Sequence, residues 1–297
     1  MGFLKGLALS LLGFLLLLSL SFLGLALTLN QTILNPAFVV SELNKLDVSL
    51  LAKDLLEGQI PQGEEYVAHV IDSTIADLEP WIKEQAGVVI HSGYDYLLGK
   101  SQSFSVVIYT GPLKDSLKDN LRQAILESPP PELAGLPPAT VEQYIDEYYQ
   151  QISREIPSNF EFSESSLGPE VMVQLEQIRQ GIGYFQLGYQ TLIGFTLLLI
   201  LGIILINRQV RSATRSLGTT FLVCGALELL GIFAASILTE TQLARLDMPV
   251  SLQVWVPQFI DDFLTPLKIF SLCAAVAGAA LIVVSFVYKP REPDYWS

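Results

Sequence analysis

Four long apolar blocks dominate the pattern of hydrophobic and polar positions along the chain. A helix needs roughly 20 apolar residues to cross the ~30 Å hydrocarbon core of a bilayer, and each block is long enough. The blocks are Gly6–Leu29, Leu187–Ile206, Leu217–Leu238 and Leu267–Tyr288. The pattern predicts a membrane protein, mainly α, with a bundle of four transmembrane helices.

The first block leaves two interpretations open, because residues 1–29 combine a basic start with an apolar run. A signal peptide has an apolar region of 7–15 residues, and this run is roughly 23 residues long. The nearest approach to an A-x-A cleavage site is Gly24-x-Ala26. We therefore expect an uncleaved transmembrane helix that serves as a signal anchor. Cleavage would leave the topology of the other three spans unchanged.

Between the first two blocks, helical periodicity predominates. We expect one helix or two short ones after Pro36, and then a helix that Pro80 kinks or divides. A further amphipathic helix begins near Leu113, and another has Thr140 as its N-cap. The last helix should run from about Gly168 directly into the second span.

A strand is predicted at residues 103–110, because Phe104, Val106 and Ile108 alternate with smaller or polar side chains. A second strand is predicted at residues 159–163, where Phe160 and Phe162 share a face. A lone strand cannot complete its hydrogen bonds, so we expect residues 103–109 to pair with 159–163. The segment between the spans is thus mostly helical, α+β with minor strand content.

Charge predicts the orientation of the spans. The loop after the second block carries Arg208, Arg211 and Arg215 without an acid, and basic residues also precede the first block and follow the fourth. Residues 30–183 hold 23 acids against 9 basic residues. Basic loops stay on the cytoplasmic side. We therefore expect both termini in the cytoplasm of a cell-membrane protein and a large, acidic extracytoplasmic domain.

These patterns divide the chain into eight segments. In order they are transmembrane helix 1–29, acidic extracytoplasmic domain 30–183, transmembrane helix 184–206, basic cytoplasmic loop 207–216, transmembrane helix 217–238, short extracytoplasmic loop 239–266, transmembrane helix 267–288 and cytoplasmic tail 289–297. The loop 239–266 carries Trp255, Phe259 and Phe263 beside two aspartates. We expect it to lie at the membrane surface, to pack under the domain or to cap the bundle.

The sequence contains few groups for catalysis or metal binding. His69 and His91 would lie about 33 Å apart on one continuous helix, at 1.5 Å per residue. There is no nucleophile motif, zinc motif or phosphate loop, and the two cysteines lie in the third and fourth blocks. We expect no cofactor and no metal. The absence of cysteine from an external domain favours a prokaryotic source.

One carboxylate stands inside an apolar block. Glu228 lies 11 residues after Leu217, or roughly 17 Å along a helix, which places it near the middle of the bilayer. Ser19 and Thr196 fall at a similar depth in their own spans. A charge there is costly, so we expect Glu228 to face the bundle interior near Ser19 or Thr196, protonated or linked to water. Gly225 shares its face and would let a neighbouring helix approach closely.

These features lead to three functional hypotheses. The first is a non-enzymatic membrane protein whose external domain mediates binding or assembly with a protein partner or a second copy. The second is a channel or transporter subunit that uses Glu228. The third is a membrane enzyme with carboxylate chemistry. The acidic domain repels nucleic acid, so the bilayer and proteins are the expected partners.

Overall fold

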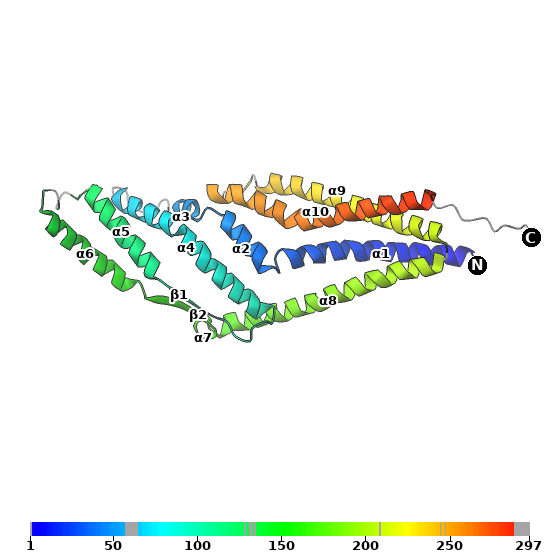
Figure 1. The fold of residues 1–297 in the computed structure, drawn as a ribbon, viewed down its shortest axis with the longest axis horizontal. Coiled ribbons are helices and arrows are strands. Elements are labelled where there is room, and N and C mark those ends of the chain that lie inside the picture. Colours follow the sequence, from blue (N-terminus) through cyan, green and yellow to red (C-terminus); the bar gives the residue numbers. More distant parts are fainter. Residues whose placement is uncertain are drawn as a thin grey trace, which may run out of the picture. The chain divides into compact units, whose positions relative to one another are not determined.

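The computed structural model describes residues 2–56, 65–127, 129–130, 133, 135–207, 209–243, 245–246 and 248–287. Most of them are helical (Figure 1). The elements in chain order are α1 (Gly2–Gln31), α2 (Pro36–Lys45), α3 (Val48–Leu56), α4 (Glu65–Leu97), β1 (Ser105–Tyr109), α5 (Gly111–Glu127), α6 (Pro138–Glu155), β2 (Asn159–Ser163), α7 (Glu164–Leu167), α8 (Pro169–Asn207), α9 (Val210–Leu243) and α10 (Val250–Val287).

The chain divides into two compact units. The bundle unit takes the described residues within Met1–Asn35, Gly181–Leu246 and Pro257–Ser297. The domain unit takes those within Pro36–Gln180 and Asp247–Val256. Each unit has its own hydrophobic clusters, so the two are described separately.

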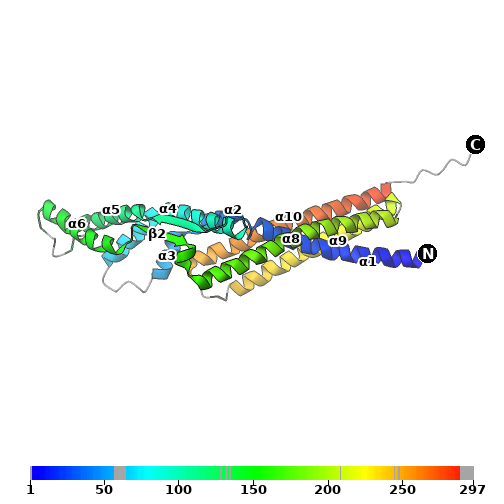
Figure 2. The same cartoon turned by 90° about the horizontal axis from the view of Figure 1, so that it is seen from below.

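The bundle unit contains the membrane-spanning parts of the chain. Among the described residues, four helices are long and apolar enough to cross a membrane, namely α1, α8, α9 and α10. Within this unit, successive helices run in opposite directions (Figures 1 and 2). The prediction of four spans is confirmed, and the helix expected near Gly168 does continue into the second span as α8.

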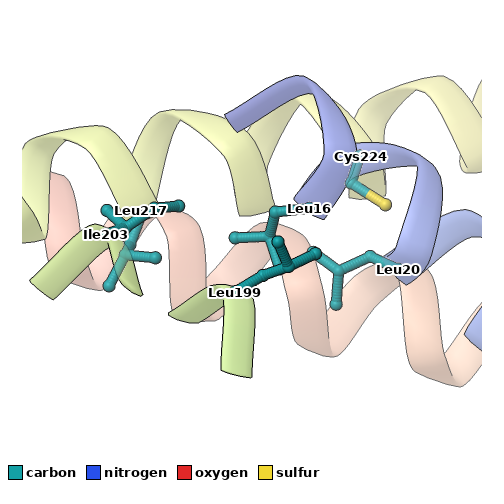
Figure 3. Close-up of a cluster of buried hydrophobic side chains, with 6 residues drawn as sticks. All are labelled: Leu16, Leu20, Leu199, Ile203, Leu217 and Cys224. Carbon is teal, nitrogen blue, oxygen red and sulfur yellow. The ribbon is translucent and has the colours of Figure 1, made fainter. Parts of the chain in front are cut away.

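Aliphatic side chains from three helices meet inside the bundle (Figure 3). Leu16 of α1 and Ile203 of α8 are completely buried there. The cluster consists of Leu16, Leu20, Leu199, Ile203, Leu217 and Cys224. Many other apolar side chains of the same helices point outward, including Phe22 and Leu198. An apolar exterior is the surface that a bilayer solvates, so this distribution agrees with a membrane-embedded bundle.

In the domain unit, α4 is the helix against which α2, α3 and α5 pack. It continues through Pro80 without a break, so the proline does not divide it. Proline removes one N–H from the helix, and the packing of three neighbours outweighs that loss. The first predicted segment forms two short helices, and α2 begins at Pro36 as expected. In the sequence, Gly58 and Pro61 mark the end of this segment, and both lie outside the described residues.

The predicted strands pair in antiparallel register. Val106 is opposite Phe162, and Ile108 is opposite Phe160. Val106 is buried and Val107 is exposed, which confirms the alternation seen in the sequence. The apolar face of this two-stranded sheet packs against the end of α4.

Helices α5 and α6 form a hairpin. In the sequence they follow β1 and precede β2, which pair with each other. Ile125 and Ile145 are each only 1% exposed in the small core between them. The predicted N-cap at Thr140 is wrong, because α6 begins at Pro138 with Pro137 as its N-cap. Proline at the first helical position has no N–H that needs a partner, so the helix starts without a capping side chain.

The segment expected as a short loop at 239–266 is mostly helical, because α9 extends to Leu243 and α10 begins at Val250. The first turns of α10 belong to the domain unit. The backbone N–H and hydroxyl of Ser251 donate to Asp54 at 3.1 and 3.0 Å, and the Trp255 indole donates to the Glu42 carbonyl at 2.9 Å. Capping by Asp54 satisfies an N–H that the start of a helix leaves free. Residues 250–256 therefore pack on the domain as part of the helix that continues into the last span.

Candidate functional site

Glu228 of α9 is hydrogen-bonded to the neighbouring helix α10. The Ser271 hydroxyl oxygen lies 2.7 Å from its Oε2, and the Cys224 thiol, one turn earlier on α9, lies 3.6 Å from Oε1. Ser21 of α1 continues this chain, with its Oγ 3.7 Å from the sulfur of Cys224. Three helices therefore contribute to one polar cluster, which we call the Glu228 cluster.

Ser19 and Thr196 meet one another and form a second polar contact. Their hydroxyl oxygens lie 2.7 Å apart, and both side chains are buried. The contact joins α1 to α8. The side chain of Glu228 contacts Ser271 and Cys224 instead. We expected Glu228 to lie near Ser19 or Thr196 because the three residues have a similar predicted depth, but the partner of Glu228 depends on which face of α9 meets which helix.

Glycine residues on α9 determine which face of this helix packs against α10. A Cβ built on Gly225 would lie less than 3.0 Å from backbone atoms of Ser271 and Ala275 in α10. Gly218 and Gly278 make equally close approaches at the other end of the same crossing. The close packing expected at Gly225 is confirmed, and α10 is the helix that uses it. Helices at this separation bring the Ser271 hydroxyl within reach of Glu228.

The arrangement of the Glu228 cluster is suited to joining helices. The Ser271 hydroxyl is also 2.7 Å from the Leu267 carbonyl of its own helix. A hydroxyl has a single proton, so it cannot donate to both oxygens at once. A carboxyl proton on Glu228, donated to Ser271, would satisfy both contacts, and the hydroxyl would then donate to Leu267. The cluster can therefore hold a proton and join α9 to α10.

A double-mutant cycle measures this contact. We expect Glu228→Ala and Ser271→Ala, each of which removes one partner, to show a coupling of about 0.6 kcal/mol in the free energy of unfolding, and no more than ~1.7 kcal/mol, as for other hydrogen bonds between membrane helices. Unfolding in detergent micelles provides the measurement. Ser236→Ala is the control, because its hydroxyl bonds the Ile232 carbonyl within α9. Additive effects of the first two substitutions would contradict the contact.

An apolar pocket lies in the domain unit, between the end of α4, the two-stranded sheet and the beginning of α8. Its volume is about 290 Å³. Gly93 belongs to its wall, and a Cβ there would be 4.0 Å from the ring of Phe104. The lining residues are Val89, Gly93, Tyr96, Leu97, Phe104, Phe162, Leu167, Val171 and Leu175. We call this space the α4–α8 pocket.

Polar groups lie beside one wall of this pocket. The Arg179 guanidinium lies over the Tyr96 ring, with Cζ 4.8 Å from the ring centre. The Tyr96 hydroxyl donates to Glu176 at 3.3 Å, and Glu176 is 3.7 Å from the nearest Arg179 nitrogen. Arg179 also donates to the Ser101 carbonyl at 3.5 Å. An apolar space therefore has beside its wall a guanidinium group whose contacts with Ser101 and Glu176 are long.

A second, more open pocket of about 620 Å³ lies between α2 and α4. Val40 and Gly87 form part of its wall, and His91 and Glu84 stand at its edge. His91 is exposed, and the side chain of His69 lies outside the described residues. Within the described part of the chain, no group of three His, Cys, Asp or Glu side chains could hold a metal ion.

Sequence reasoning found the Glu228 cluster in part and did not find the α4–α8 pocket. Alternation identified the apolar face of Phe104 and Phe162, which is one wall of the pocket. The opposite wall comes from Val171 and Leu175, which we assigned only to a helix leading into the membrane. No protein-family model, curated protein or solved structure matches the chain.

Proposed function

We propose that this chain is a multi-pass protein of the cell membrane whose acidic domain, built on residues 36–180, lies outside the cytoplasm and binds an apolar ligand or partner group without catalysing a reaction. The α4–α8 pocket is the observation that carries this proposal. It provides a preformed apolar space in a domain whose segment, residues 30–183, holds 23 acids. Pockets that bind small ligands are mostly apolar and begin at about 300 Å³.

The described acids give less support to an enzyme. The α4–α8 pocket has no acidic residue in its wall, and the α2–α4 pocket has Glu84 alone. Carboxylate chemistry of the glycosidase type needs two such groups facing one substrate. The same reasoning applies to transport, because Glu228 already has contacts at both oxygens, and no second acid stands in its span.

Binding in the pocket is testable with an uncharged, environment-sensitive dye and the full chain in nanodiscs. We expect the dye to become fluorescent when it binds the wild-type domain. Gly93→Leu should abolish that signal, because the new side chain would project into the pocket. Gly87→Leu is the matched control, because it lies on the same helix and faces the α2–α4 pocket. Equal signals from the wild type and both variants would contradict the proposal.

Orientation has its own test. We expect a green fluorescent protein fused after Ser297 to fluoresce in cells, because that tail is proposed to be cytoplasmic. Alkaline phosphatase inserted between α5 and α6 should be active, because that loop is proposed to lie outside. The reverse pair of results would overturn the orientation drawn from the basic loops.

A further inference from the structure

We infer that the α4–α8 pocket binds the hydrocarbon chain of a long-chain fatty acid, with the carboxylate of the ligand held by Arg179. This inference rests on the proposed binding function and names its ligand class. It combines the shape and lining of the pocket with the position of one guanidinium group.

The size of the pocket limits the ligand to a single chain. A volume of about 290 Å³ is at the small end of ligand pockets, which span about 300–1,000 Å³. A lipid with two acyl chains would leave at least one of them in water. A single chain can bury its methylene groups against Phe104, Phe162 and Leu175.

The lining offers no free partner to a polar group inside the pocket, and it therefore disfavours a peptide. Of the lining side chains, Tyr96 is the one that carries a polar atom, and its hydroxyl already donates to Glu176. Each peptide unit that enters a pocket needs partners for an N–H and a carbonyl. A hydrocarbon chain needs none, so it matches this lining.

Arg179 can hold an anionic head group. Arginine carries five N–H donors in a planar fork that matches a carboxylate. The contacts of Arg179 with the Ser101 carbonyl and with Glu176 are long, at 3.5 Å and 3.7 Å. Stacking on Tyr96 orients the guanidinium beside the pocket wall. A carboxylate ligand can therefore form shorter bonds than the ones Arg179 makes within the protein.

Charge in the rest of the domain opposes an anion only weakly at this site. Charges separated by more than about 8 Å are largely screened at physiological salt, so the close neighbours decide the local field. Glu176 is in ion-pair contact with Arg179 at 3.7 Å, so it competes with the ligand for the guanidinium group. Its removal should therefore strengthen binding rather than weaken it.

The membrane is the proposed source of the fatty acid, because one helix both lines the pocket and contains an apolar span. Val171 and Leu175 belong to α8, and the same helix continues to Asn207 through a span that is apolar enough to cross the membrane. Fatty acids dissolve in lipid bilayers, so a protein with such a span is anchored in the membrane that contains the proposed ligand.

The test uses full-length protein in phosphatidylcholine nanodiscs and a palmitate analogue with a photoreactive group in its chain. We expect light-induced labelling of peptides from α4, β2 and α8, mapped by mass spectrometry. Excess palmitate should abolish the labelling, whereas hexadecanol should compete at least about tenfold less well, because it lacks the carboxylate.

Three variants and one control variant complete the test. Gly93→Leu should reduce labelling at least about tenfold by occupying the pocket. Arg179→Gln should remove the advantage of palmitate over hexadecanol, and Glu176→Gln should increase the apparent affinity for palmitate. Gly87→Leu should behave as wild type. Circular dichroism and thermal unfolding of each variant establish that it is folded.

The outcomes separate the two proposals. If the uncharged dye binds in the pocket but palmitate has no advantage over hexadecanol, the ligand class is wrong and the binding function stands. If Gly93→Leu changes neither dye binding nor palmitate labelling, both proposals are overturned. Labelling confined to the membrane spans would likewise overturn the fatty-acid site.

Discussion

Leucine at Gly278 is expected to destabilise the bundle by about 3 kcal/mol or more in the free energy of unfolding. A Cβ on Gly278 would lie less than 3.0 Å from backbone atoms of Gly218 and Leu222 in α9. Backbone atoms cannot rotate away as a side chain does, so the two helices must separate. Overpacking of a close contact costs typically 1–3 kcal/mol, and this crossing is closer than an ordinary one.

Separation of α9 from α10 should also break the contact between Ser271 and Glu228. Leucine at Gly225 should have the same effect, since its Cβ would meet the backbone of Ser271 and Ala275. Removing that hydrogen bond leaves a carboxyl without its partner in an apolar medium, which adds to the loss. Gly225→Leu and Gly278→Leu should therefore give similar decreases in stability.

Gly231→Leu is the matched control for both substitutions. Gly231 lies on α9, and nothing stands within 4 Å of a Cβ built there. Leucine has the better helix propensity by roughly 0.8 kcal/mol, so this variant should unfold at the wild-type temperature or slightly above it. Thermal unfolding in one detergent compares the three variants. Equal stability of all three would show that α9 and α10 do not pack through these glycines.

Neutralising Glu79 is expected to cost the domain about 2 kcal/mol at pH 7, through the loss of charge-assisted hydrogen bonds. Its carboxylate accepts hydrogen bonds from the Ser49 hydroxyl at 2.5 Å and from Lys83 at 2.7 Å. The backbone N–H groups of Val48 and Ser49 also donate to it, each at 3.4 Å. Glu79 of α4 thus caps the beginning of α3, where the helix dipole favours a negative charge.

The pKa of Glu79 gives this stabilisation a pH dependence. Burial raises the pKa, but the hydrogen bonds from Lys83 and Ser49 outweigh burial and hold the pKa at about 2, below the ordinary value of 4.5. The folded protein therefore binds this proton more weakly than the unfolded chain does. The contribution is present above pH 4.5 and is lost as the pH falls towards 2.

We expect Glu79→Gln to lower the free energy of unfolding at pH 7, and the difference from wild type to shrink steadily below pH 4.5. Urea unfolding of the full chain in detergent, followed at several pH values, measures this difference. Glu84→Gln is the control, since Glu84 is an exposed acid on the same helix. A difference that stays constant between pH 7 and pH 3 would show that the charge of Glu79 is not the cause.

Several elements were predictable because they depend on short-range patterns. The four spans follow from the length of apolar runs, and the pairing of 105–109 with 159–163 follows from alternation in two isolated segments. Each of these features depends on the length or the periodicity of a single element, which can be counted in the sequence. Counting residues along the spans gave Ser19 and Thr196 a similar depth, but the prediction placed both as neighbours of Glu228, and their contact with each other was not predicted.

Other elements required knowledge of which helix lies next to which. The start of α10 packs on α2 and α3 through Ser251 and Trp255, in a region expected to form a loop. A tryptophan beside two aspartates suits a surface segment equally well, so the local pattern could not decide. Thr140 is a common N-cap residue, yet Pro138 allowed α6 to start earlier.

The sequence by itself determined the four candidate spans, through the length of the apolar runs, and the apolar face of the sheet, through alternation, because both patterns involve residues that are close together in the chain. Residue counting also predicted that Glu228 lies at mid-depth in its span, among small residues. The tertiary structure decided that Glu228 meets Ser271, that Glu79 caps α3, and that Gly93 and Leu175 line one pocket. Those pairs lie 30 to 82 positions apart in the chain. The type of an apolar or acidic residue does not indicate which distant residue the fold places beside it.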